Sequence, residues 1–541
     1  MHTPFLRPSI QLGWLALLGA ACTPAQVDFE APPIPAGDAP VEPFVDPDMV
    51  EVRVASEGVQ VCEAPEERVE LGPFSRRSAS QPSPSMDYLW SSGVLVGDLD
   101  GDGYHDVISP TEPFAQLYRG GEAGKQEAVP NLRTFDLTFG AGGSLADFDD
   151  DGDLDVLLAR FSEPDRLLRN EGAGRFTDVT IDVGLGDAGP STCSTWGDVD
   201  RDGDLDLFIC RYGDLLDDGG PAPSKLYENV GGAFLDRSDH LPTEVHERWT
   251  RMAGFHDLDL DGYPELVVVN DLGDASQVLW NRRGHLEADP GALGHAVRGA
   301  GLGVAELDGD GLPDLLVTEW GSLSLMLSER SDGWVDHANR LHLQLDTARQ
   351  QMVPWGAEFA DVDNDGDLDA IVAFGFLEVD GFDWSNPEQQ PDALFLQSAD
   401  GTFVDVAEAW GLADRGVGRG FVAVDLNRDG FLDLVKRDLD GPSVLYLSRC
   451  SDAGWLNVSF RQPGRSNVLG VGTMVRAWMG DTFVQGTVHA GGTGFGSGGP
   501  PEVHLGLGDV DTIDRLEVFW PDGGYSELRD LPTRQRVTLT R

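Results

Sequence analysis

The sequence predicts an all-β protein, namely a seven-bladed β-propeller followed by a small C-terminal β-rich domain. Three observations lead to this prediction. An acidic nonapeptide, Asp-x-Asp-x-Asp-Gly-x-x-Asp, occurs seven times in the 541 residues, beginning at residues 98, 147, 198, 257, 306, 361 and 425. Short apolar segments flank each copy, and a strand–turn–strand pattern follows most of them. Successive copies begin 49, 51, 59, 49, 55 and 64 residues apart. A repeat of about this length is typical of solenoids and propellers.

Each repeat carries signals for four strands. Apolar segments rich in β-branched residues lie directly before and after the acidic loop, as at residues 420–424 and 265–269. Asn, Asp and Gly then cluster between two further apolar segments, as at residues 226–234, and such clusters suit hairpin turns. Four strands make one blade, so seven loops predict seven blades. An eight-bladed ring is the alternative if residues 50–90 supply a blade without a loop.

The acidic loops predict calcium sites. Calcium takes six to eight oxygen ligands, and alternating carboxylates on a tightly curled loop supply them. Position 6 is Gly in all seven copies, which permits the sharp turn. Positions 1, 3, 5 and 9 hold Asp or Glu in every copy, with the single exception of Asn427. We therefore expect about seven calcium ions and no other cofactor.

The candidate ligands are the residues at these four positions. At position 1 they are Asp98, Asp147, Asp198, Asp257, Glu306, Asp361 and Asp425. At position 3 they are Asp100, Asp149, Asp200, Asp259, Asp308, Asp363 and Asn427. At position 5 they are Asp102, Asp151, Asp202, Asp261, Asp310, Asp365 and Asp429. At position 9 they are Asp106, Asp155, Asp206, Glu265, Asp314, Asp369 and Asp433.

Other acidic metal motifs fit less well. An EF-hand needs Glu at position 12 and flanking helices, whereas strand-like segments follow these loops. Zinc prefers His or Cys ligands, which the candidate ligand positions lack.

The repeats resemble the FG-GAP/VCBS repeats of the integrin α-chain propeller. Residues 172–185, Gly-Ala-Gly-Arg-Phe-Thr-Asp-Val-Thr followed by Val-Gly-Leu, are similar to the version found in cartilage acidic proteins and their bacterial relatives. Residues 467–475, 491–497, 504–508 and 518–523 resemble the ASPIC/UnbV domain of the same family. The resemblance implies structural calcium in each blade and a domain order of propeller, then ASPIC/UnbV domain.

The N-terminal residues have the pattern of an export signal. Arg7 precedes an apolar run over residues 10–21, which ends at Cys22. We expect residues 1–21 to be a signal peptide and residues 22–49, rich in Pro and acids, to be a tether. The propeller is expected over 50–454 and the C-terminal domain over 455–541. Cys22 resembles a bacterial lipoprotein cleavage site, so a lipid anchor at the cell envelope is the favoured interpretation and simple secretion is the alternative.

Four further cysteines suggest disulfides in an exported chain. Cys62, Cys193, Cys210 and Cys450 allow three pairings. Cys193 and Cys210 flank the third loop at similar distances and are expected to face each other across one hairpin. Cys62 would then pair with Cys450, and buried free thiols are the alternative.

Two further patterns have ordinary structural interpretations. The glycine run over residues 491–499 lacks the Gly-Lys-Ser/Thr of a phosphate-binding loop, so a turn or bulge is expected there. Seven tryptophans could form a sugar-stacking face, but positions in the core of the blades are favoured for most of them. These are Trp90, Trp196, Trp249, Trp280, Trp320, Trp355 and Trp384.

The charge restricts the partners. The formal net charge is −55, which excludes nucleic acid as a natural partner, because phosphates need Lys and Arg. Common catalytic motifs such as Gly-x-Ser-x-Gly and His-Glu-x-x-His are absent. We therefore expect a non-catalytic surface binding or adhesion module for a glycan or protein. The alternative is a secreted calcium-dependent carbohydrate-active enzyme, a lyase or a hydrolase.

Overall fold

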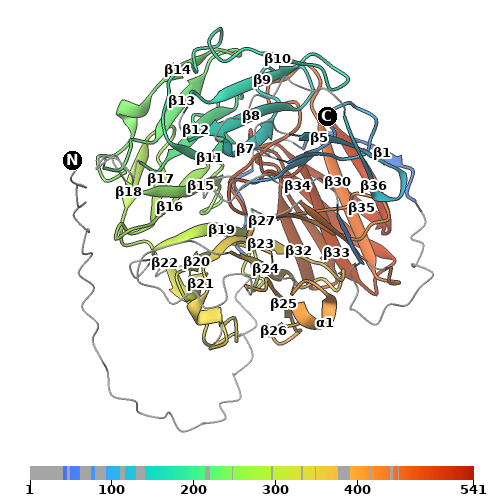
Figure 1. Ribbon diagram of the computed structural model, residues 1–541. Coiled ribbons are helices and arrows are strands. Elements are labelled where there is room, and N and C mark those ends of the chain that lie inside the picture. Colours follow the sequence, from blue (N-terminus) through green and yellow to red (C-terminus); the bar gives the residue numbers. More distant parts are fainter. Residues whose placement is uncertain are drawn as a thin grey trace, which may run out of the picture. The chain divides into compact units, whose positions relative to one another are not determined.

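Each acidic loop joins the first two strands of a four-stranded antiparallel sheet in the computed structural model (Figure 1). The structure describes residues 40–541 except 46–48, 61–74, 79–92, 110–115, 130–139, 162, 214–219, 246–247, 294–296, 330–332, 348, 376–389, 414–415, 439–442 and 449. The expected signal peptide, Cys22 and Cys62 lie outside the described residues.

Six of these sheets are built from four consecutive strands. The first three are β3 (Leu95–Gly97), β4 (Asp106–Ser109), β5 (Gln116–Gly121) and β6 (Lys125–Ala128); β7 (Gly140–Ala146), β8 (Asp155–Arg160), β9 (Arg166–Asn170) and β10 (Phe176–Asp178); and β11 (Ser191–Gly197), β12 (Asp206–Arg211), β13 (Lys225–Asn229) and β14 (Phe234–Asp236). The next three are β15 (Thr250–His256), β16 (Glu265–Asn270), β17 (Gln277–Asn281) and β18 (Leu286–Asp289); β19 (Gly299–Ala305), β20 (Asp314–Glu319), β21 (Ser322–Glu329) and β22 (Gly333–Asp336); and β23 (Pro354–Ala360), β24 (Asp369–Phe374), β25 (Ala393–Gln397) and β26 (Phe403–Asp405).

A seventh sheet takes its outer strand from far away in the chain. It consists of β27 (Gly418–Val424), β28 (Asp433–Asp438), β29 (Val444–Leu447) and β2 (Ser75–Ser78). Strand β2 pairs antiparallel with β29, so an N-terminal strand completes the last sheet. An additional blade from residues 50–90 was the alternative, and the described parts of this range supply single strands to two sheets instead.

The seven sheets form a β-propeller. Their first strands β3, β7, β11, β15, β19, β23 and β27 contact one another in this order, and β27 contacts β3. In Figure 1 the labelled first strands lie around a centre, and β10, β14, β18, β22 and β26 lie farther out. The second strands are buried, and most of them are largely apolar, as in β16 with Leu266 to Val269 at 0 % exposure. The all-β class and the propeller arrangement are confirmed.

The C-terminal domain adds two four-stranded sheets. One contains β32 (Thr482–Thr487), β31 (Met474–Met479), β34 (Thr512–Phe519) and β35 (Tyr525–Pro532). The other contains β1 (Arg53–Glu57), β36 (Gln535–Thr540), β30 (Gly454–Arg461) and β33 (Glu502–Gly508). Strand β1 therefore belongs to the C-terminal domain, which departs from the expected assignment of residues 50–454 to the propeller.

Helical structure is limited to short turns in the described residues. These are η1 (Glu122–Gly124), η2 (Ser238–His240), η3 (Arg349–Gln351) and α1 (Ala407–Trp410). No helix found there is long and apolar enough to cross a membrane.

A glycine-rich segment of the C-terminal domain, residues 489–499, lies at the centre of the propeller. We call it the central segment. Its backbone forms hydrogen bonds with the first strands of the ring or directly beside them: Gly494 N–H donates to Leu302 O on β19 at 3.0 Å, and Gly498 N–H donates to Val94 O, directly before β3, at 3.1 Å. The sequence predicted only a turn or bulge here.

The central segment is glycine-rich because it passes between backbones. Gly143 N–H donates to Gly496 O at 3.0 Å. A Cβ on the neighbouring Gly142 would lie 2.6 Å from the same oxygen, so a side chain at this position would prevent the approach.

Candidate metal centres

The seven acidic loops share one backbone geometry. In each, the N–H of position 6 donates to the carboxylate of position 1, as Gly203 does to Asp198 at 3.0 Å and Gly366 to Asp361 at 2.8 Å. The Gly at position 6 has φ between 87° and 102° in all seven loops. Side chains are strained at this φ, which explains the invariant Gly.

Position 4 also takes a positive φ, a feature that the sequence analysis missed. It holds Gly, Asp, Arg, Leu or Asn with φ between 59° and 80°, for example 62° at Asp150 and 61° at Arg428. Values near 60° lie in the left-handed region that non-glycine residues tolerate at modest cost. No residue preference marks this position, so the sequence carried no signal for it.

The carboxylate at position 9 has a structural task besides any metal ligation. One oxygen accepts the N–H of position 2, and the other accepts an N–H from the end of the third strand. In the third loop Asp206 accepts from Val199 at 2.9 Å and from Asn229 at 2.9 Å. Equivalent pairs occur in all seven loops. Position 9 therefore ties the loop to its blade.

The candidate ligands converge in several loops. In the first four, side chains of positions 1, 3 and 9 each bring an oxygen within 4.8 Å of the others. These groups are Asp98, Asp100 and Asp106; Asp147, Asp149 and Asp155; Asp198, Asp200 and Asp206; and Asp257, Asp259 and Glu265. In the fifth loop the group is Glu306, Asp308 and Asp310. Position 5 lies outside the first four groups, and its oxygen accepts the N–H of position 7, as Asp202 does from Asp204 at 3.0 Å.

Buried carboxylate oxygens without a hydrogen-bond partner lie in five of the loops. They belong to Asp100, Asp149, Asp198, Asp257 and Asp363. A buried, unpaired carboxylate oxygen is costly, and a divalent cation bound beside it, among the carboxylates of its loop, would remove that cost. The donor sets of these loops therefore fit calcium.

Burial and the closeness of the carboxylates in each loop disfavour their negative charges when no cation is bound. Burial raises the pKa of Asp155 to about 9 and that of Asp206 to about 8, and carboxylates of the same loop act in the same direction. Burial likewise raises the pKa of Asp147 and of Asp257 to about 7. Protons and a metal ion would thus compete for these oxygens.

The segments that match a known repeat family coincide with acidic loops. The FG-GAP-like repeat family matches residues 147–209, 257–317 and 306–372, and each match begins at position 1 of an acidic loop. The ASPIC and UnbV family matches residues 463–541. The chain contains FG-GAP-like repeats and a C-terminal ASPIC/UnbV domain.

Curated relatives share one short stretch with this chain. Human cartilage acidic protein 1 is 46 % identical over 61 residues, which is 11 % of this chain and 9 % of the relative. The Xenopus tropicalis protein is 44 % identical over the same length and coverage. The chain thus matches about a tenth of the length of these relatives.

Solved structures with similar arrangements are distant. YCF48 bound to a D1 peptide is 11 % identical with a TM-score of 0.41, covering 72 % of this chain and 98 % of that one. An Agrocybe aegerita lectin that recognises non-reducing terminal N-acetylglucosamine is 15 % identical with a TM-score of 0.36, covering 65 % and 87 %.

The ASPIC/UnbV domain covers the face of the FG-GAP propeller that carries the acidic loops, here called the loop face. Its residues form hydrogen bonds with several loops. These bonds join Asn467 N–H to Asp150, Gln485 to Gly311 O, His504 to Asn364, and Glu502 to His105. Residues 41–44 also lie on this face, where Phe44 N–H donates to Leu260 O at 2.8 Å. Residues 41–44, which belong to the described part of the expected tether over 22–49, are therefore hydrogen-bonded to the loop face.

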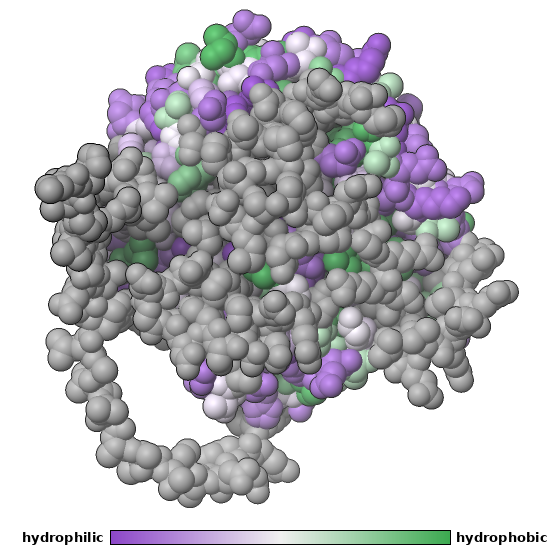
Figure 2. Space-filling model, viewed as in Figure 1, coloured by the Kyte–Doolittle hydropathy of each residue, from purple (hydrophilic) through white to green (hydrophobic). Residues whose placement is uncertain are grey.

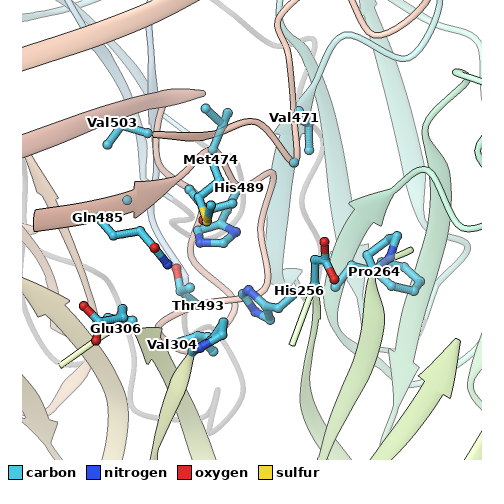
Figure 3. A pocket seen from close by; sticks show the side chains of 18 of the residues that line it. His256, Pro264, Val304, Glu306, Val471, Met474, Gln485, His489, Thr493 and Val503 are labelled. Atoms are coloured by element: carbon cyan, nitrogen blue, oxygen red, sulfur yellow. The ribbon is translucent and has the colours of Figure 1, made fainter. Parts of the chain in front are cut away.

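A cavity of about 270 Å³ lies between the propeller and the ASPIC/UnbV domain. Figure 3 shows His256 and His489 approaching each other beside Thr493, and their ring centroids are 4.6 Å apart. Glu306 and Glu358 also line the cavity, and burial raises the pKa of Glu358 to about 8. No sequence motif links these groups, because they come from separate blades and from the C-terminal domain.

The cysteine prediction is confirmed in one part. Cys193 and Cys210 face each other on β11 and β12 and form a disulfide, with a Cα–Cα distance of 5.0 Å. Cys450 is disulfide-bonded, and its expected partner Cys62 lies outside the described residues.

Proposed function

We propose that this protein is an exported, calcium-stabilised propeller that acts as a non-catalytic surface binding or adhesion module for a glycan or a protein. The observation that carries the proposal is the set of converging carboxylates with buried, unpaired oxygens in the acidic loops. Calcium bound there would fix the first hairpin of each blade and would keep the ring rigid. A rigid scaffold is what positions the residues of a binding face.

The binding face is the one opposite the acidic loops. Successive antiparallel strands alternate in direction, so the connections between second and third strands lie opposite the loop face. The ASPIC/UnbV domain already occupies the loop face, and its central segment occupies the middle of the ring. The opposite face carries Trp320, 40 % exposed, between β20 and β21. An exposed Trp suits sugar stacking or a protein contact.

The other tryptophan candidates divide between core and surface. Trp196 and Trp355 are buried and belong to the core. Trp249 and Trp280 are partly buried, and Trp90 and Trp384 lie outside the described residues. Among the coloured residues of Figure 2, hydrophilic ones prevail, in keeping with a net charge of −55. Trp320 is therefore the residue through which we test the proposed face.

The test is a screen of the calcium-saturated mature protein against glycan arrays and surface extracts, scoring retention and cleavage separately. We expect retention without cleavage. Trp320→Ala is expected to weaken retention, whereas Val404→Ala on the outer strand β26 serves as a control and leaves it unchanged. Retention that is insensitive to Trp320→Ala would contradict the proposed face, and no retention at all would contradict the binding function.

A calcium-dependent carbohydrate-active enzyme is the second candidate, favoured by one observation. The cavity beside His256 and His489 contains Glu358, a carboxyl group outside the acidic loops with a pKa raised by burial. Its volume of about 270 Å³ lies below the ~300–1,000 Å³ typical of ligand sites, so the binding module comes first. Cleavage in the screen that is abolished by Glu358→Gln would reverse this order.

Export is supported by the Cys193–Cys210 disulfide, because such bonds persist in oxidising compartments. We propose a lipid anchor at Cys22, with the cell envelope or outer surface as the location. Metabolic labelling with a fatty acid tests this: the wild-type chain is expected to incorporate label, and Cys22→Ala is expected to lose it. Unlabelled wild-type protein in the medium would indicate simple secretion.

A further inference from the structure

The seventh acidic loop differs from the others in what its first carboxylate contacts. As in the other loops, the Asp425 carboxylate accepts N–H bonds within the loop, from Asp429 at 3.0 Å and Gly430 at 3.0 Å. One of its oxygens also accepts a bond from Nη1 of Arg536 at 3.1 Å. Both side chains are buried, with exposed fractions of 0 % for Asp425 and 6 % for Arg536. A cationic group of the protein thus already lies against this loop.

Arg536 is held in place from both domains. It lies on β36 of the ASPIC/UnbV domain, and its Nη2 donates to Glu502 at 2.9 Å. Glu502 in turn accepts a bond from Asn457 at 2.9 Å and lies 3.2 Å from Nε2 of His105, at position 8 of the first loop. The guanidinium is therefore fixed between two carboxylates, one from each domain. Breaking such a buried pair would leave an uncompensated charge.

The seventh loop also departs from the acidic pattern that makes the other loops fit calcium. Its position 3 is Asn427, whose amide donates to the second oxygen of Asp429 at 2.9 Å and whose carbonyl accepts Asp429 N–H at 3.0 Å. Among the described residues, buried unpaired carboxylate oxygens occur in the first four loops and the sixth, but not in the fifth or the seventh. The fifth loop nevertheless brings Glu306, Asp308 and Asp310 together, and all of its candidate ligand positions are acidic. A divalent ion in the seventh loop would meet one carboxylate fewer and a guanidinium at contact distance, which repels it.

We propose that Arg536 is the resident cation of the seventh loop. This loop binds the ASPIC/UnbV domain instead of calcium, and the protein takes six calcium ions where the sequence pattern predicts seven. The inference rests on the proposed calcium binding of the first six loops. It assigns the seventh loop the task of fixing the C-terminal domain on the loop face.

Anomalous scattering from crystals of the full chain soaked in terbium(III), a calcium mimic, locates each ion directly. We expect peaks in the first six loops and none in the seventh. A peak of similar height in the seventh loop would overturn this inference and leave the calcium proposal intact. The absence of peaks from all loops would overturn both.

Ion counting by native mass spectrometry tests the same point in solution with matched variants. Asp198→Asn, at position 1 of the third loop, is expected to lose one calcium ion. Asp425→Asn, at position 1 of the seventh loop, is expected to lose none, and loss of one ion would overturn the proposal.

A gain-of-site variant keeps the proposal testable if Asp425→Asn does not fold. The double variant Arg536→Gln with Asn427→Asp removes the guanidinium and restores the consensus carboxylate, so it is expected to bind one ion more than the wild type. Arg534→Gln, which removes a partly exposed arginine two residues before Arg536, is the control and leaves the count unchanged. An unchanged count in the double variant would contradict the proposal.

Discussion

The acidic residues of one loop have the same side-chain chemistry but make different contacts. Asp198 and Asp200 point oxygens toward a common centre, whereas Asp206 also receives two backbone N–H groups of its own blade. Asp202 caps the turn by accepting Asp204 N–H and lies outside the converging group. Substitutions of these carboxylates should therefore have unequal effects.

Asp206→Asn is expected to destabilise the calcium-saturated protein by about 1–3 kcal/mol more than Asp202→Asn. An amide offers a single acceptor, so one buried N–H, of Val199 or Asn229, loses its partner. Asp202 is exposed, and its amide variant keeps the oxygen that accepts Asp204 N–H. Urea denaturation of both variants in calcium measures the difference. Equal losses would argue against the structural task of position 9.

Gly366→Ala is expected to cost about 1–3 kcal/mol, because φ of 100° is strained for any residue with a Cβ. Space is not the reason, since an added Cβ would meet no atom closer than 3.9 Å. Gly58→Ala is the matched control: no atom lies within 4 Å and no positive φ is required, so the change should stay within about 0.5 kcal/mol. Thermal unfolding compares the two variants, and similar melting temperatures would refute the backbone argument.

Elements divide into those with local sequence signals and those without. The hairpins around each acidic loop were predictable, because apolar periodicity and turn residues are local, and so was the Cys193–Cys210 bond across one hairpin. Strands β1 and β2 were not, because each pairs with a strand near the opposite end of the chain, and only tertiary packing selects such partners. The central segment was predicted as a turn, since a glycine run gives no hint that the first strands of a ring surround it.

The central segment links the two domains, and Gly142→Ala tests this link. A Cβ on Gly142 would lie 2.6 Å from Gly496 O and 2.8 Å from its Cα, so the segment or the strand β7 must shift. We expect a loss of about 1–3 kcal/mol, as for overpacking in a core. Hydrogen exchange should speed up at the N–H groups of Gly494 and Gly498. Gly121→Ala on β5, where no atom lies within 4 Å, is the control, and unchanged exchange in Gly142→Ala would contradict the linking role.

At the scale of the whole molecule, the loop face concentrates negative charge beneath a covering domain. The chain carries 93 acidic and 38 basic residues, and every candidate ligand position except Asn427 is acidic. Arg536 is predicted to neutralise one loop from the ASPIC/UnbV side, and calcium is proposed for the others. The sequence revealed the carboxylates, but it could not reveal which cation each loop receives, because the choice depends on which strand of the C-terminal domain lies above.

Stability should therefore depend on pH in opposite ways with and without calcium. Burial raises the folded-state pKa of Asp106, Asp147, Asp198 and Asp257 from 3.8 to about 7. A group with a raised folded pKa binds its proton more tightly in the folded state, so its stabilising effect is complete below pH 4 and disappears as the pH rises to about 7. When a chelator removes calcium, the melting temperature is expected to decrease as the pH rises from 4 to 7.

Calcium should reverse this trend, because it binds the deprotonated carboxylates and competes with protons. The increase in melting temperature on adding saturating calcium is therefore expected to be larger at pH 8 than at pH 5. Magnesium at the same concentration controls for general charge screening and should raise the melting temperature less, since it demands octahedral geometry and releases water reluctantly. Differential scanning calorimetry at both pH values measures these shifts. A calcium effect that is equal at pH 5 and pH 8, or one that magnesium reproduces, would show that the acidic loops do not hold calcium through their carboxylates.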